Sequence, residues 1–75
     1  MNLTEISQLQ LYLRRRFNDP ELSVRARPNK QDSAEVYSGD EFIGVLFRDE
    51  EEGEISYDFN MAILDVDLEE VAGNA

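Results

Sequence analysis

The feature that most constrains the fold of this chain is a change in the spacing of its apolar residues after Pro20. Before Pro20, the side chains of Ile6, Leu9, Leu13 and Phe17 recur every three or four residues, which is typical of one face of an α-helix. After it, apolar and polar residues alternate, which is typical of strands with one buried face. The change predicts an α+β fold, with an N-terminal helix packed on one face of a four- to five-stranded antiparallel β-meander.

The helix is predicted over residues 3–17. Asn2 is a good N-cap, and Glu5 stands three residues later, as a capping box requires. Three arginines, at residues 14–16, fall in the last turn, where positive charge suits the helix dipole. Pro20 and the polar residues before it then end the helix.

The alternating segments predict four strands, over residues 22–27, 34–37, 42–49 and 55–59. Gly39-Asp40 suits a two-residue hairpin loop of type I′ or II′. Such a loop places Ser38 opposite Glu41 and Val36 opposite Ile43. Turn chemistry and apolar alternation agree on this register.

The register divides the side chains between the two faces of the sheet. The face under the helix is predicted to hold Val24, Val36, Ile43, Val45, Phe47, Ile55 and Tyr57, with Arg48 opposite Glu54 in the last hairpin. The other face then carries an apolar group with a charged border, made of Tyr37, Phe42, Gly44, Leu46 and Arg48. An apolar centre with a charged rim is typical of a protein interface. The alternative is that the C-terminal segment folds back and covers this group.

The C-terminal segment leaves two structures open. Leu64, Val66 and Leu68 alternate with acidic residues, which favours a fifth strand after a bulge or turn near residues 60–63. The alternative is a short helix over residues 66–72, with Asp65 as its cap and Gly73 as its end. In either case we expect one domain over residues 1–71 and a disordered tail over residues 72–75.

The composition argues against an enzyme. The 75 residues include no His and no Cys, which removes the usual nucleophile–base pairs and the nitrogen and sulfur ligands of metals. No phosphate-binding glycine loop occurs. We therefore expect a non-catalytic protein without a cofactor or metal. Clustered acids in the loop Asp49–Glu54 leave a small-molecule or divalent-cation-binding regulator as the alternative, although calcium-loop spacing is missing.

The charges of the chain are unevenly distributed. The net charge is −10, which argues against binding to nucleic acids or anionic membranes as a whole. Residues 1–30 nevertheless hold six of the seven basic side chains, and residues 31–75 hold fourteen of the seventeen acids. The opposite halves are expected to pair within the fold, as Arg25 does with Glu35 across the first hairpin, or between two copies in a homodimer. Four arginines form a candidate basic patch for an acidic protein or RNA, although the interleaved aromatic residues typical of nucleic-acid sites are missing: Arg14, Arg15, Arg16 and Arg27.

No apolar stretch approaches membrane-spanning length, and the N-terminus lacks the pattern of a signal peptide, so a cytoplasmic location is expected. The runs LQLYLRRRF, VRARP and DSAEVYSGDEFIGVLFRDEEEGEISYDFNMAILDVDL resemble a family of short alphaproteobacterial proteins of unknown function. The similarity covers roughly residues 3–68. The resemblance implies a compact domain of bacterial, cytoplasmic origin and transfers no catalytic or binding residue. We therefore expect a small protein–protein interaction or adaptor module, with an unidentified protein partner.

Overall fold

Helix α1 (Leu3–Arg16) begins at the predicted capping box. The Oδ1 atom of Asn2 accepts a hydrogen bond from the backbone N–H of Glu5 at 2.7 Å, and the Oε1 atom of Glu5 accepts one from the N–H of Asn2 at 3.1 Å. The helix ends at Phe17, after which Asn18 adopts a left-handed backbone with φ of 51°. Both ends of the predicted helix are confirmed to within one residue.

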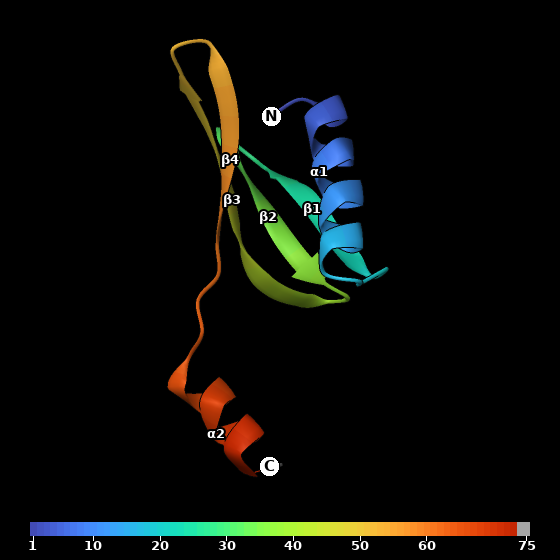
Figure 1. Ribbon diagram of the computed structural model, residues 1–75, viewed down its shortest axis with the longest axis vertical. Helices are drawn as coiled ribbons and strands as arrows, with labels where there is room; N and C mark the ends of the chain where they lie inside the picture. Colours follow the sequence, from blue (N-terminus) through green and yellow to red (C-terminus); the bar gives the residue numbers. More distant parts are fainter. Residues whose placement is uncertain (74–75) are drawn as a thin grey trace.

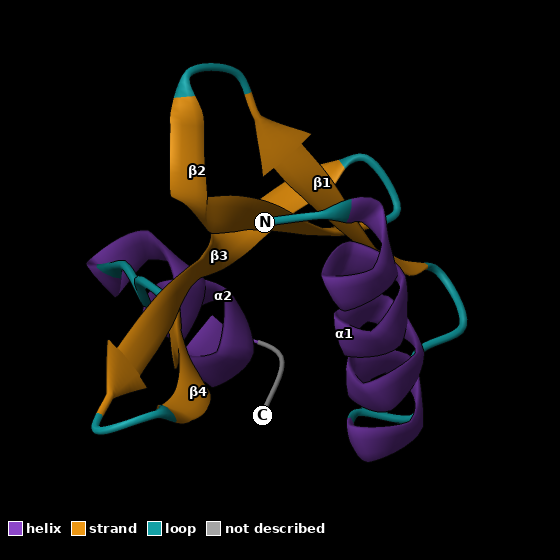
Figure 2. Ribbon diagram, turned by 90° about the horizontal axis from the view of Figure 1, so that it is seen from above, coloured by secondary structure: helices purple, strands orange, loops and turns teal. Residues whose placement is uncertain are grey.

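Four antiparallel strands follow in the spatial order β1-β2-β3-β4: β1 (Leu22–Arg27), β2 (Lys30–Ser38), β3 (Glu41–Glu51) and β4 (Glu54–Asn60). The computed structural model describes residues 1–73. In Figure 1, α1 runs along one side of the sheet and makes its main contacts with β1. Figure 2 shows how strongly the sheet twists, so that β4 turns away from β1. The predicted α+β fold is confirmed.

Each hairpin of the sheet closes through a tight turn that contains a left-handed residue. The predicted Gly39-Asp40 loop is confirmed, with Ser38 opposite Glu41 and φ of 60° at Gly39. The other two loops are shorter than predicted, because Asn29 and the pair Glu52-Gly53 adopt positive φ and let the strands continue further.

A β-bulge in β3 corrects the predicted register beyond this loop. Tyr37 pairs with Phe42 as predicted, but Val36 pairs with Gly44 and leaves Ile43 as the extra residue. One extra residue moves every later side chain of β3 to the other face of the sheet. The prediction that Val36 lies opposite Ile43 is therefore wrong.

The bulge decides which residues form the core. Leu46 is 2% exposed and lies under α1, whereas Phe47, predicted to be in the core, is 42% exposed. The last hairpin shifts as well, so that Arg48 lies opposite Tyr57 instead of Glu54. The buried core consists of Leu13, Leu22, Val24, Ala34, Val36 and Leu46.

Gly44 is buried on the helix-covered face, where β3 and β4 approach closely. A Cβ atom at this position would lie 2.5 Å from the carbonyl oxygen of Asn60 and 2.5 Å from the ring of Phe59. Only glycine fits such a contact without moving backbone. The glycine therefore allows Phe59 to cover this part of the core.

The C-terminal segment is a helix, α2 (Asp65–Gly73), so the favoured fifth strand is wrong and the helical alternative is confirmed. Its first turn is closed by Leu64, whose carbonyl accepts from Asp67 and Leu68 and whose N–H donates to the Oδ2 atom of Asp67 at 2.9 Å. Figure 1 shows α2 beyond the end of the sheet. Two residues of the predicted tail, at 72–73, belong to α2, and residues 74–75 lie outside the described part.

Candidate functional site

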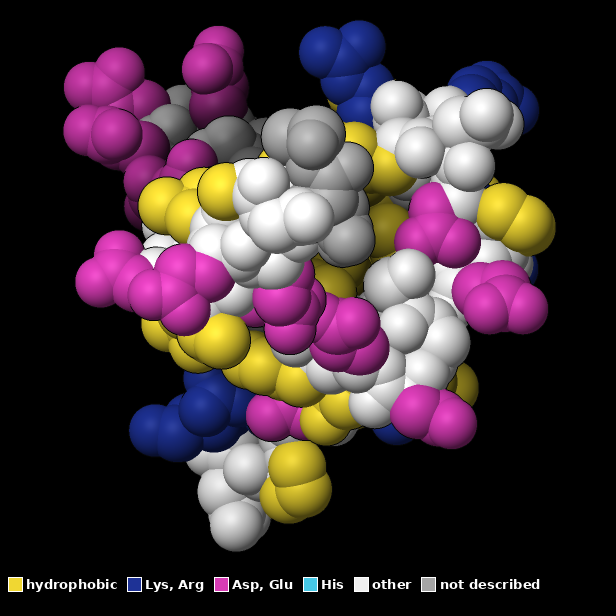
Figure 3. Space-filling model, turned by 90° about the horizontal axis from the view of Figure 1, so that it is seen from below, with side chains coloured by type: hydrophobic (Ala, Val, Ile, Leu, Met, Phe, Trp, Pro, Cys, Tyr) yellow, Lys and Arg dark blue, Asp and Glu magenta, His cyan; other side chains and the backbone are white. Residues whose placement is uncertain are grey.

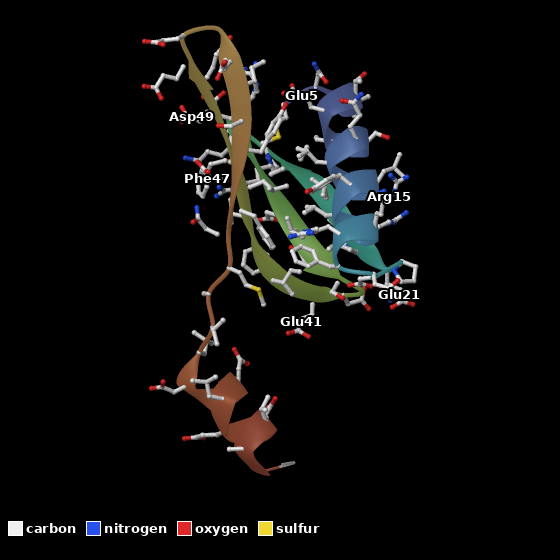
Figure 4. The ribbon with its side chains drawn as sticks, viewed as in Figure 1. Glu5, Arg15, Glu21, Glu41, Phe47 and Asp49 are labelled. Atoms are coloured by element: carbon white, nitrogen blue, oxygen red, sulfur yellow. The ribbon has the colours of Figure 1, made fainter. Side chains whose placement is uncertain are left out.

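The face of the sheet that α1 leaves uncovered, here called the open face, presents side chains from β1, β2 and β3: Arg25, Glu35, Tyr37, Phe42, Val45 and Phe47. Phe42 is 50% exposed and Phe47 is 42% exposed. Figure 4 shows Phe47 projecting from the sheet on the side away from α1. Two half-exposed aromatic rings in so small a domain form the most apolar part of this face.

One half of the open face is a stacked aromatic group. The guanidinium of Arg25 lies 3.9 Å from the centre of the Tyr37 ring, and the ring of Phe42 meets Tyr37 edge-on at 5.6 Å. The Tyr37 hydroxyl donates to the Oε1 atom of Glu35 at 3.2 Å. Arg25 lies across from Glu35, as the sequence predicts. The predicted ion pair, however, is not among those of residues 1–73, because the guanidinium stacks on the ring instead.

The other half of the open face surrounds Phe47 with basic and polar groups. A shallow hollow of about 380 Å³ lies beside the ring and is bordered by Arg27, Lys30 and Asp32. Arg27 donates to the hydroxyl of Ser33 at 3.1 Å, which holds its guanidinium near the ring. The hollow therefore combines an exposed aromatic surface with a local excess of positive charge.

The predicted interface group is only partly on the open face. Tyr37 and Phe42 lie there, but Gly44, Leu46 and Arg48 lie on the face that α1 covers, because of the bulge in β3. The sequence prediction correspondingly missed Val45 and Phe47. No apolar pattern could have found them, since the run from Phe42 to Phe47 is apolar at both parities.

On the helix side of the sheet, Glu5, Arg48 and Tyr57 form a polar cluster that the sequence did not predict. The Nε atom of Arg48 donates to the Oε2 atom of Glu5 at 2.9 Å, and the Tyr57 hydroxyl donates to the same oxygen. Figure 4 shows Glu5 at the N-terminal end of α1, on the side that faces the sheet. Arg48 is the one basic residue after residue 30, which is the signal that could have indicated a specific carboxylate partner.

The cluster shifts the titration of its members. The hydrogen bonds from Tyr57 and from the backbone of Asn2, with the charge of Arg48, hold the pKa of Glu5 below its usual value. The hydrogen bond to Glu5 and partial burial raise the pKa of Tyr57. These shifts keep Glu5 ionised and Tyr57 neutral, so the three groups satisfy one another and join α1 to β3 and β4.

The four arginines of the predicted basic patch are not brought together. Arg14 donates to the carbonyl of Leu22 at 2.6 Å and lies near the start of β1, with Arg15 and Arg16 on the same turn of α1. Arg27 lies at the other end of β1, beside Ser33. Arg15 points away from the sheet in Figure 4. The arginines of α1 therefore form one basic region and Arg27 belongs to another.

The acidic loop Asp49–Glu54 is the tip of the hairpin between β3 and β4. Its carboxylates stand around the turn at Glu52-Gly53, and within residues 1–73 no three acidic side chains converge so as to hold a metal ion. The divalent-cation alternative therefore gains no support from the geometry of the described chain. No helix among these residues is long and apolar enough to cross a membrane.

A protein family described as "Protein of unknown function (DUF3126)" matches residues 5–67, which include most of α1, all four strands and the start of α2. The chain belongs to the DUF3126 family. No curated protein and no solved structure matches it. The sequence resemblance is confirmed as far as a family of unknown function, and because the family has no assigned function, the match names no site residue.

Proposed function

We propose that this DUF3126 protein is a non-catalytic protein-interaction module that binds a protein partner through its open face. The observation that carries the proposal is the pair of half-exposed rings, Phe42 and Phe47, on the face left uncovered by α1. Aromatic side chains that stay exposed on a sheet face are typical anchors of protein interfaces. Tyr37 and Val45, half-buried between the rings, extend the apolar surface.

The charges around Phe47 indicate the chemistry of the partner. Arg27 and Lys30 border the hollow beside the ring, whereas residues 31–75 carry fourteen acidic side chains and one basic side chain. A partner that places an apolar side chain against Phe47 and a carboxylate near Arg27 would satisfy both features. We therefore propose a protein with an acidic border around an apolar surface patch.

A catalytic function is less well supported. The chain lacks His and Cys, and the described groups with shifted pKa values are Glu5, Arg48 and Tyr57, which bind one another. A general acid needs a raised carboxyl pKa, whereas the pKa of Glu5 is lowered. We also propose a bacterial, cytoplasmic setting, as the sequence resemblance implies.

The experiment compares proteins captured from the native cell by the unaltered chain and by variants. Phe47→Glu and Phe42→Glu should each lose the same captured protein, because each places a charge in the apolar part of the open face. Leu3→Glu is the matched control, since Leu3 is exposed on α1, away from this face. Capture is quantified by mass spectrometry, and circular dichroism verifies that each variant is folded.

Two results would contradict the proposal. If both phenylalanine variants retain every captured protein, the open face is not the binding surface. If Phe47→Glu unfolds the chain, the ring contributes to the core and is not available to a partner.

A further inference from the structure

The C-terminal arm, residues 61–73, leaves all six of its large apolar side chains more than half exposed. The exposed fractions lie between 51% and 69% for Met61, Ile63, Leu64, Val66, Leu68 and Val71. Leu64, Leu68 and Val71 recur at four and three residues, which aligns them along one side of α2. Figure 3, seen from the end where α2 lies, shows acidic groups around exposed apolar side chains.

Helix α2 needs a surface to pack against. It has nine residues, whereas isolated helices shorter than about 12 residues are marginal in water. Its four acids, Asp65, Asp67, Glu69 and Glu70, are accompanied by no basic residue on the arm. A surface that stabilises the helix must therefore be apolar and bordered by positive charge.

The body of the protein offers such a surface between α1 and β4. A groove of about 460 Å³ has Leu13 and Leu46 at its floor and Tyr12, Phe17 and Phe59 along its walls, with Arg16 at its border. The rings of Phe17 and Phe59 lie 6.1 Å apart across it. Arg15 and Arg14 stand on the same turn of α1 as Arg16. The groove thus offers an apolar floor for the apolar side of α2 and positive charge to complement the acids of the arm.

A second hollow, of about 640 Å³, lies between α2 and the end of the β2–β3 hairpin of the same chain. Phe42 and Ile43 form one side of it and Leu68 and Val71 the other, but Glu41, Asp67 and Glu70 also line it. Closing this hollow would bring like charges together without a basic residue in its lining. Electrostatics therefore favours packing of α2 in the groove between α1 and β4 over packing against the β2–β3 hairpin of its own chain.

The direction of the chain favours the groove of a second copy. Residues 61–64 carry α2 beyond the end of the sheet (Figure 1), and they contribute to a molecule 46 Å long and 23 Å wide. To reach the groove of its own chain, the arm would have to reverse within these four residues, directly after β4 ends. Exchange between two copies keeps the extended connection and forms a closed two-fold interface from one helix and one groove of each copy.

We propose that two copies of this protein form a dimer by exchanging arms, with α2 of each copy in the groove between α1 and β4 of the other. Leu64, Leu68 and Val71 then cover Tyr12, Phe17 and Phe59. The acids of α2 lie near the arginines at the end of α1. The exchange uses the surface opposite the open face, so it is independent of the proposed binding of another protein.

The test combines two variants that damage different halves of the exchange. Tyr12→Asp alters the groove and Leu68→Asp alters the helix, and both side chains are more than half exposed, so the body should remain folded. Leu11→Asp is matched to the groove variant, because Leu11 and Tyr12 are both 61% exposed on α1 and only Tyr12 lines the groove. Val66→Asp is the control for the helix variant, because Val66 lies off the apolar stripe.

Sedimentation velocity and native mass spectrometry measure the outcome over a range of concentrations. The unaltered chain should be a dimer, each of Tyr12→Asp and Leu68→Asp should raise the dissociation constant at least tenfold, and the two controls should dimerise normally. An equimolar mixture of Tyr12→Asp and Leu68→Asp should recover a heterodimer, because one intact helix then meets one intact groove.

Three results would overturn the proposal. A monomeric unaltered chain would mean that the arm folds onto its own body or stays free. A dimer unaffected by both variants would place the interface elsewhere. A mixture without heterodimers would mean that the two damaged surfaces do not meet. Phe47→Glu should leave the dimer intact, so a failure of the open-face proposal can be told apart from a failure of this one.

Discussion

The body of the protein, residues 1–60, and the arm, residues 61–73, use apolar side chains of the same kinds in opposite ways. In the body, leucines and valines from α1 and three strands meet in one buried core. In the arm, every leucine, isoleucine and valine is at least half exposed. Burial in this protein therefore depends on the arrangement of neighbouring elements, because the apolar residue types in the two regions are the same.

The backbone hydrogen bonds explain why the arm is helical although its sequence alternates. A strand needs a neighbouring strand to satisfy its N–H and C=O groups, whereas a helix satisfies its own. The chain leaves β4 at Asn60 and passes beyond the sheet, where none of the strands described within residues 1–73 lies beside it (Figure 1). The same segment therefore forms α2, closed at its start by Asp67 and Leu64.

The largest expected effect is a difference between two leucines. Leu46→Ala should lower the free energy of unfolding by about 2–5 kcal/mol, because it leaves a cavity in the core. Leu68→Ala should change it by less than about 0.5 kcal/mol in a dilute, monomeric solution, because Leu68 is exposed. Chemical denaturation measures both values. Equal losses in the two variants would contradict the division into body and arm.

A smaller effect is expected for glycines in the two regions. Gly44→Ala should cost about 1–3 kcal/mol, because the added Cβ meets the carbonyl of Asn60 and the ring of Phe59. The Cβ atom that Gly73→Ala adds in the arm meets no atom of the described residues within 4 Å, so this variant should leave the free energy of unfolding unchanged. Thermal unfolding of both variants provides the measurement. If Gly44→Ala leaves the melting temperature unchanged, β3 and β4 can move apart at this point without loss of stability.

The smallest expected effect concerns the carboxylate that joins α1 to the sheet. Glu5→Gln should cost about 1 kcal/mol near neutral pH, because the charged hydrogen bonds to Arg48 and Tyr57 are lost. Glu69→Gln in the arm is the control, since its side chain is exposed and should contribute little. Denaturation curves of the two variants and the unaltered chain give the comparison.

The pH dependence of that difference follows from the pKa shifts. Because the pKa of Glu5 is lowered by folding, its contribution is complete above the ordinary value of 4.5 and is lost as the pH falls through the folded pKa. Because the pKa of Tyr57 is raised by folding, its contribution is complete below 10.0 and is lost as the pH rises through the folded pKa. The advantage over Glu5→Gln should therefore be constant near neutrality and shrink in acid. A difference that grows below pH 4.5 would contradict this assignment.

The candidate site could be predicted from the sequence only in part. Tyr37 and Phe42 lie on the open face because the Gly39-Asp40 turn fixes the pairing nearest to it. Beyond the bulge the prediction fails, and Val45 and Phe47 take the places assigned to Gly44 and Leu46. The cluster of Glu5, Arg48 and Tyr57 was not predicted, because its members are far apart in the chain and carry no spacing motif; the isolated positive charge of Arg48 was the one signal of it.

The local structure of this protein follows directly from its sequence: the helix between the capping box and Pro20, the alternating strands, and the hairpin turn at Gly39-Asp40. These features depend on backbone preferences and on side chains a few residues apart, which a sequence displays directly. The buried face of β3 depends on contacts with other elements. Residues 42–47 are apolar at both parities, and the bulge at Ile43 turns Leu46 toward Leu13 of α1, while Gly44 leaves room for the ring of Phe59.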